Sequence, residues 1–98
     1  MKNTYVIKVT WADEDILIKN RVTIPYAKHN AILQDGRKVT FITSHKTLWP
    51  GFYVVEARLE EDPKWGLKLK RVKVKDRNPD EETIENSGIY EFCKNLKQ

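Results

Sequence analysis

The sequence predicts a mainly β protein, a small five-stranded barrel followed by a short C-terminal helix. Apolar and polar residues alternate along five short segments, which is the period of a half-buried strand. Turn-forming residues separate these segments, and from residue 78 onward the apolar spacing becomes helical. A chain of 98 residues is long enough for one domain with one core. We therefore divide it into a barrel over residues 1–77 and a helical segment over residues 78–98.

The first two strands form a predicted hairpin. In the first strand one face carries the apolar residues Tyr5, Ile7, Val9 and Trp11. This alternation places Trp11 in the core. The polar run 12–15 indicates the turn, and a second strand then follows until Pro25. Residues 25–36 carry a weaker pattern. We expect a loop or one helical turn from Pro25 to Leu33, and then a turn at Asp35-Gly36.

Three further strands complete the barrel. The third begins at Val39, and an irregular link ending in Pro50-Gly51 separates it from the fourth. The inward row of the fourth strand is Tyr53, Val55, Ala57 and Leu59. In the fifth strand the apolar positions are Leu67 and Leu69, then Val72 and Val74. Their parity slips by one at Lys70-Arg71, which predicts a β-bulge, because a one-residue slip would otherwise turn every later side chain to the other face.

The C-terminal segment has helical signals. Asn78 and Pro79 suit an N-cap and a first helical residue, and acids follow in the first turn. Ser87-Gly88 interrupts this helix, and an apolar stripe with helical spacing follows. The stripe consists of Ile89, Phe92, Cys93 and Leu96. It either packs back on the barrel or docks a partner domain.

The order of these elements favours one kind of barrel. A hairpin, a third strand, a connection and a second hairpin are the order of an OB-like barrel, with an SH3-like barrel as the alternative. Closure of the sheet leaves no free edge. Because the link before the fourth strand is short, the helix usual at that place in OB folds must be reduced or absent.

Charge is distributed unevenly along the chain. The formal net charge is +4, but residues 1–79 carry +7 and residues 80–98 carry −3. A basic body favours polyanionic partners. Trp65 and Lys64 stand in the turn before the fifth strand, which continues with a dense set of cations. These cations are Lys68, Lys70, Arg71, Lys73 and Lys75.

Basic side chains beside aromatic ones are typical of surfaces that bind single-stranded nucleic acid. We expect the cations to contact phosphates and Trp65 to stack on a base, with Phe52 and Tyr53 as weaker stacking candidates. The alternatives are that the lysines only protect a strand edge and that Trp65 covers an end of the barrel. The acidic run 60–62 is interpreted as a solvated loop.

Other chemistries find little support. His29 and His45 have no second ligand at metal-binding spacing, so we expect no metal and no cofactor. Cys93 is the only cysteine and has no histidine beside it, so neither a disulfide nor a nucleophile is expected. No apolar stretch reaches the ~20 residues that cross a bilayer. We expect a non-enzymatic protein of the cytoplasm with no membrane partner.

Parts of the chain resemble the N-terminal OB-like domain of RecD-like DNA helicases, relatives of the exodeoxyribonuclease V alpha subunit. The similar features are Val39-Thr40-Phe41-Ile42, Leu48 before Pro50-Gly51, Asp62-Pro63-Lys64-Trp65-Gly66 and Ser87-Gly88-Ile89-Tyr90-Glu91-Phe92. The third of these resembles a His-Pro-Lys-Tyr-Gly turn of that family. The chain lacks the family's Asn-Gly-Phe-type turn in the first hairpin, a GxxxxGK[ST] motif and a helix-hairpin-helix unit, so it is no helicase by itself.

The resemblance and the charge pattern lead to one main hypothesis. The chain would be a non-catalytic module that binds single-stranded DNA without sequence preference, or that positions DNA for a helicase core, and DNA is favoured over RNA. The alternative is a protein-interaction module, such as an adaptor or a small phage-type inhibitor, that binds no nucleic acid.

Overall fold

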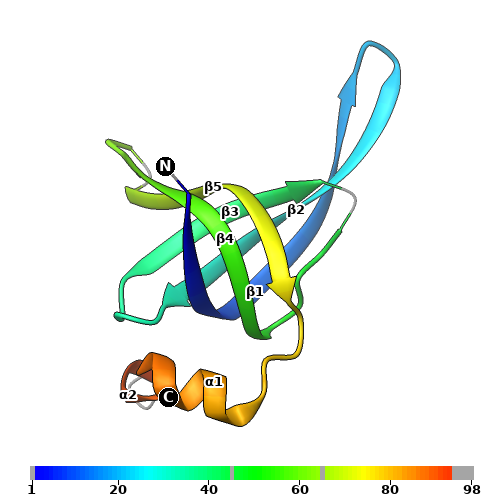
Figure 1. Ribbon diagram of the computed structural model, residues 1–98. Coiled ribbons are helices and arrows are strands. Elements are labelled where there is room, and N and C mark those ends of the chain that lie inside the picture. The colour runs from blue at the N-terminus through cyan, green and yellow to red at the C-terminus, as the bar shows by residue number, and fades with distance from the viewer. Residues whose placement is uncertain (1, 45, 65, 94–98) are drawn as a thin grey trace.

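The computed structural model describes residues 2–44, 46–64 and 66–93. Its five strands are β1 (Asn3–Lys19), β2 (Val22–Leu33), β3 (Lys38–Ser44), β4 (Gly51–Asp62) and β5 (Gly66–Asp76). They close into a barrel in the order β1-β2-β3-β5-β4 (Figure 1). The pairing of β3 with β5 is parallel, and the other pairings are antiparallel. The predicted small OB-like barrel is therefore confirmed.

The first hairpin is much longer than the sequence indicated. Its turn lies at Asn20-Arg21, whose φ angles of 51° and 64° are left-handed, as in the tight turns of β-hairpins. The predicted turn at 12–15 is wrong, because β1 runs through it without a break. The loop or helical turn expected from Pro25 to Leu33 is also wrong, since β2 continues past Pro25 to Leu33. The turn expected at Asp35-Gly36 is confirmed, and the Gly36 N–H donates to the Leu33 carbonyl there. The outer half of this hairpin projects from the barrel as a two-stranded arm (Figure 1).

The placement of Trp11 in the core is wrong as well. The β1–β2 register shifts between Val9 and Trp11, so Thr10 is an additional residue in β1. Such a bulge reverses the side-chain parity of the strand. Val9 points inward and is fully buried, whereas Trp11 pairs with the exposed Asn30 and is itself 46% exposed.

The bulge predicted at Lys70-Arg71 is confirmed. Arg58 pairs with Lys70 and Glu56 pairs with Lys73, so the β4–β5 register shifts at this place. Two residues, Arg71 and Val72, therefore stand opposite the single residue between Glu56 and Arg58. The φ of Arg71 is 54°, in the left-handed region. The bulge allows the apolar residues on both sides of it to face the core while the cations stay outside.

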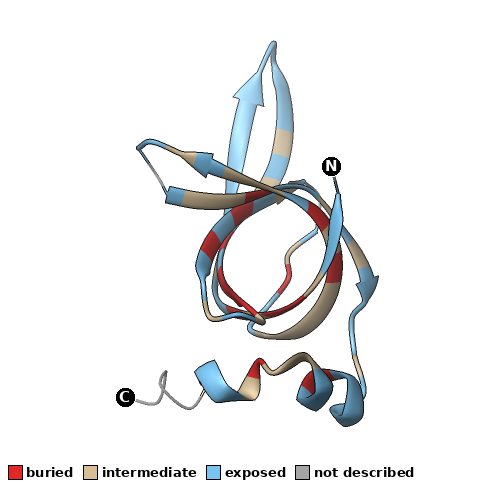
Figure 2. Cartoon of the chain, turned by 60° about the vertical axis from the view of Figure 1, so that its left-hand side comes forward, coloured by how far each residue is buried: buried red, intermediate tan, exposed pale blue. Residues whose placement is uncertain are grey.

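The core lies inside the barrel, as the ring of buried residues in Figure 2 shows. Its buried members come from all five strands and from the β3–β4 connection. They are Ile7, Val9, Ala31, Leu33, Val39, Phe41, Leu48, Val55, Ala57 and Leu69. The predicted inward row of β4 is confirmed for Val55 and Ala57, and Tyr53 and Leu59 pack against the same core.

Two short helices, α1 (Glu81–Ser87) and α2 (Tyr90–Cys93), lie outside the barrel against its wall, where they pack on Val6 of β1 and on Phe52 and Val54 of β4 (Figure 2). The N-cap is Asp80, whose carboxylate accepts a hydrogen bond from the Thr83 N–H at 2.8 Å, so the expected cap at Asn78 is wrong. Gly88 ends α1 with a φ of 84°. No helix of the described ranges is both long and apolar enough to cross a membrane.

The C-terminal stripe packs back on the barrel. Ile89 is fully buried in a second cluster with Val6 and Ile84, and Cys93 is packed against this cluster. Phe92 lies against the β2–β3 turn, where a Cβ on Gly36 would clash with its ring. Leu96 lies outside the described residues. As far as the stripe is described, the barrel itself is its partner.

Candidate nucleic-acid interface

Four strands contribute to one outward-facing row of residues. Trp11 of β1 is paired with Asn30 of β2, Asn30 with Thr40 of β3, and Thr40 with Lys68 of β5. Trp11, Asn30 and Thr40 are exposed, and Lys68 is half-buried. The bulge at Thr10 is what turns Trp11 toward this row.

A groove of about 530 Å³ follows this row, and we call it the Trp11 groove. Its floor is formed by the buried side chains of His29, Phe41 and Leu69. Its rim carries the row residues together with Ile42, whose side chain is 62% exposed. The cations on this rim are Lys28, Lys68, Lys70 and Arg71.

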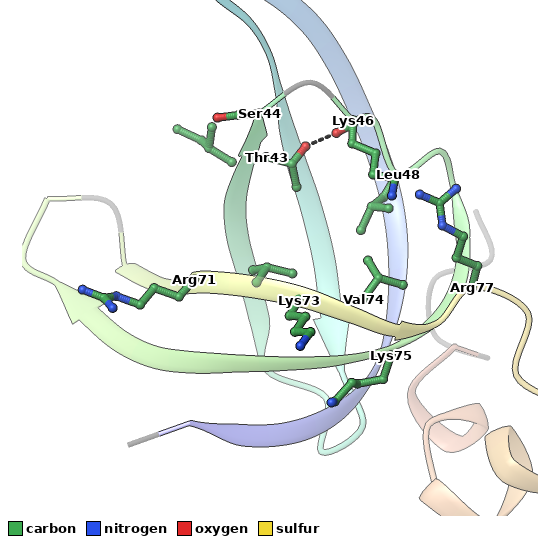
Figure 3. Close-up of a pocket in the computed structure, with 11 residues that line it drawn as sticks. Thr43, Ser44, Lys46, Leu48, Arg71, Lys73, Val74, Lys75 and Arg77 are labelled. Atoms are coloured by element: carbon green, nitrogen blue, oxygen red, sulfur yellow. Dashed lines mark hydrogen bonds between the residues drawn. The ribbon is translucent and has the colours of Figure 1, made fainter.

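A second groove of about 620 Å³ continues along the same side, and we call it the β3–β5 groove (Figure 3). It exists because β3 and β5 are paired at Thr40 and Lys68 and separate beyond that point. Leu48 from the β3–β4 connection and Val74 from β5 line this gap. The cations along it are Lys46, Arg71, Lys73, Lys75 and Arg77.

The two grooves share Ile42 and Arg71, so they form one continuous surface. Eight different cations line it, and no Asp or Glu is among the described residues that line either groove. Clustered cations without acids raise the local concentration of anions. The surface therefore suits an extended polyanion better than a small neutral ligand.

Acids of the β4–β5 hairpin reduce the charge at one end of this surface. Lys68 forms an ion pair with Asp62 at 3.4 Å, and Lys70 forms one with Glu60 at 3.4 Å. Arg71, Lys73 and Lys75 form no ion pair with any described residue. The strongest uncompensated positive charge is thus in the second half of β5.

The structure brings together only part of the predicted site. The five cations of β5 all line the two grooves. Lys64 is in the exposed turn between β4 and β5, where its N–H donates to Asp62 Oδ1 at 2.8 Å. Trp65 lies outside the described residues, so its stacking role stays a prediction.

The two weaker stacking candidates lie elsewhere. Phe52 packs against Tyr90 of α2 with ring centroids 5.6 Å apart, and Lys8 Nζ is 4.7 Å from the Phe52 centroid. Tyr53 packs on the main core, and its hydroxyl donates to the Trp49 carbonyl at 2.7 Å. Neither residue lines the grooves.

Sequence reasoning missed several groove residues. Trp11 was assigned to the core, and Lys28, Asn30, Thr40, Ile42 and Lys46 were not singled out. The exposure of Ile42 could have been predicted from the sequence. Val39 and Phe41 mark the inward row of this strand, so the alternation turns Ile42 outward. Lys46 and Arg77 come to the groove only through the path of the connections that carry them.

A buried histidine anchors the β3–β4 connection beneath this surface. His29 is 1% exposed and stacks on Phe41 with centroids 4.4 Å apart. The Leu48 N–H donates to His29 Nε2 at 3.0 Å, so Nε2 must be unprotonated. The proton of the neutral ring is then on Nδ1, which lies 3.3 Å from the Phe41 carbonyl oxygen. Burial is the main reason why the pKa of His29 lies below its usual 6.5.

This arrangement predicts a pH-dependent stability. A histidine with a lowered folded pKa contributes stability that is fully present above its unfolded pKa of 6.5, and this is lost as pH falls from there through the folded pKa. We expect the free energy of unfolding, measured with urea, to fall between neutral pH and mildly acidic pH. In His29→Phe, which has no titrating ring, this part of the pH dependence should disappear. An equal pH dependence in parent and variant would contradict the assignment.

Metal and thiol chemistry receive no support from the site. Within the described ranges no group of three or more His, Cys, Asp and Glu side chains is arranged to hold a metal ion. Burial raises the pKa of the Cys93 thiol, which disfavours the reactive thiolate.

Comparison with known proteins adds no assignment, because no protein-family model, no curated protein and no solved structure matches the chain.

Proposed function

We propose that this chain is a non-catalytic module that binds single-stranded DNA, with little sequence preference, along the joined Trp11 and β3–β5 grooves. The observation that carries the proposal is the continuous surface with eight cations, no lining acid among the described residues, and an exposed tryptophan at one end. Cationic grooves with aromatic platforms are the usual means of holding single strands.

In this proposal the two ends of the surface have different roles. Arg71, Lys73 and Lys75 of β5 offer three uncompensated charges along the β3–β5 groove for the phosphates of one strand. Trp11 and Ile42 offer apolar surface for the faces of unpaired bases. A duplex hides those faces, so this combination favours a single strand.

A role beside a RecD-like helicase core belongs to the same proposal. It is supported by the resemblance of residues 39–75 and 87–92 to that family's OB-like domain and by the barrel itself. In this role the chain would hold the separated strand in the cytoplasm while another polypeptide hydrolyses nucleotide. No part of the proposal requires catalysis by this chain.

The Trp11→Ala variant tests the proposal. Loss of one base-stacking contact should weaken binding of a labelled single-stranded oligonucleotide by about 1–3 kcal/mol, or roughly 5- to 150-fold. Since Trp11 is half-exposed and outside the core, the melting temperature should change little. Fluorescence anisotropy gives the affinity, and circular dichroism gives the melting curve.

Trp49→Ala is the matched control. Trp49 is exposed to a similar extent, at 55% against 46% for Trp11, but it does not line the grooves. It should bind the oligonucleotide as the parent does. Equal affinity in the Trp11 and Trp49 variants would show that bases do not stack in the Trp11 groove.

A further inference from the structure

The projecting arm of the β1–β2 hairpin is almost entirely exposed (Figure 2), and it carries several large apolar side chains. Ile16, Leu17, Ile18 and Val22 are 50–72% exposed, although large aliphatic residues are normally buried. In β2 the arm comprises the residues before Tyr26, which have no pairing with β3. Two-stranded hairpins that pack on nothing are at best marginally stable in water. An arm with this composition therefore needs a partner surface.

The register of the hairpin separates the arm into two faces. Leu17 is opposite Ile24 and Lys19 is opposite Val22, so these four share one face, which we call the outer face. It continues toward the barrel with Asp15 opposite Tyr26. The inner face carries Ile16 opposite Pro25, and Ile18 opposite Thr23.

We propose that two copies of this chain pair through the outer faces of their arms, packed antiparallel about a two-fold axis that crosses both arms at Leu17 and Ile24. Such an axis places Leu17 on Leu17 and Ile24 on Ile24 of the second copy. Residues equally far from the axis then meet in pairs. Lys19 on the tip side meets Asp15 on the base side, and Val22 meets Tyr26.

The outer face is thus complementary to itself in both charge and hydrophobicity, as a two-fold interface requires. Lys19 forms no ion pair with any described residue of its own chain. Asp15 accepts from the Ile16 N–H at 2.8 Å and from the Tyr26 hydroxyl at 3.3 Å, and it is exposed. Its carboxylate has room to accept a further bond from the ammonium group of the second copy.

The inner face is not complementary to itself in this way. An equivalent axis at Ile16 would set Ile18 against the carboxylate of Glu14, which already accepts a hydrogen bond from Thr47 at 2.5 Å. A charge against an apolar side chain would lose hydration without gaining a partner. The arrangement therefore selects the outer face.

The contact is small. It uses a few side chains from each copy, and interfaces below about 1,200 Å² belong to weak or transient associations. We therefore expect a reversible dimer in the micromolar range. Sedimentation velocity over a series of protein concentrations should show a shift from monomer to dimer.

Charge exchange tests the geometry. Lys19→Asp opposes two carboxylates at each contact, and Asp15→Lys opposes two ammonium groups, so each single variant should remain monomeric. The double variant Lys19→Asp/Asp15→Lys restores opposite charges at the same positions and should dimerise again. Because these residues lie outside the barrel core, melting curves should show that all three variants are folded.

The two faces provide a matched control. Leu17→Asp should abolish the dimer, whereas Ile18→Asp, one residue away on the inner face, should leave it intact. A parent chain that stays monomeric at all concentrations would overturn the proposal. A dimer that Ile18→Asp disrupts and Leu17→Asp does not would also overturn it, because the arm would then pair through another surface. The same holds if the parent chain is a monomer and Leu17→Asp lowers its oligonucleotide affinity, because the arm would then contact the nucleic acid.

Discussion

We expect Leu48→Ala to lower the free energy of unfolding by about 2–5 kcal/mol, the usual range for truncating a buried leucine. Leu48 is 2% exposed and belongs to the main core, although it comes from a connection without regular secondary structure. It lines the gap where β3 and β5 separate. Since domains of this size are stable by about 5–15 kcal/mol in total, the loss should be a large fraction of the stability.

Trp49→Ala is again the control, measured by urea unfolding beside Leu48→Ala. The Trp49 side chain is exposed, and the contact with the Tyr53 hydroxyl uses its backbone carbonyl, which the substitution leaves in place. It should change stability by about 0.5 kcal/mol or less, as surface substitutions usually do. If both variants were equally stable, the connection would not be part of the core.

The second large effect is expected in binding. The triple variant Arg71→Gln/Lys73→Gln/Lys75→Gln removes the three uncompensated cations of β5. Three phosphate contacts contribute about two units to the slope of log K against log salt for single strands. Between ~50 mM and ~1 M salt, which is roughly 1.3 decades, a slope of two units corresponds to about 10²- to 10³-fold in affinity. The triple variant should therefore bind about 10²- to 10³-fold more weakly than the parent chain at ~50 mM salt. Fluorescence anisotropy at low salt measures the loss directly.

Net charge alone would produce a smaller effect, which a matched triple variant isolates. Arg21→Gln/Lys2→Gln/Lys38→Gln also removes one arginine and two lysines, and both triple variants lower the formal net charge from +4 to +1. All three of its positions are exposed and none lines the grooves. Equal losses in the two variants would mean that binding follows overall charge and not the β5 cations.

The elements that could be predicted from the sequence are those in which burial imposes a clear pattern. Val55 and Ala57 of β4 face the core, and the slip at Lys70-Arg71 is visible because apolar residues mark the inward row on both sides of it. The sequence shows no such slip in the apolar pattern at the Thr10 bulge. Trp11 extends an apolar row beyond the bulge, so the alternation indicates burial although the parity has reversed.

The long hairpin could not be predicted for a related reason. Outside the barrel no core selects the side chains, and the acids of residues 13–15 therefore resemble a turn. Within the barrel, the inward positions of β2 include Ala27, His29 and Ala31, which give a weak hydrophobic signal. The Trp11 groove takes Trp11 from beyond the Thr10 bulge and Lys28 and Asn30 from this part of β2, so these residues were missed. Its β5 cations were identified because they lie in one continuous segment.

The salt dependence of binding to a single-stranded oligonucleotide tests most directly whether the joined grooves contact phosphates. If three to four phosphates contact the joined grooves, log K should fall with log salt at a slope of roughly −2 to −3 for the parent chain. The slope of the Arg71/Lys73/Lys75 triple variant should be about two units shallower than that of the parent chain. Anisotropy titrations at several salt concentrations give both slopes. No binding at low salt, or an affinity that does not change with salt, would contradict the proposal that these grooves hold a single strand by its phosphates.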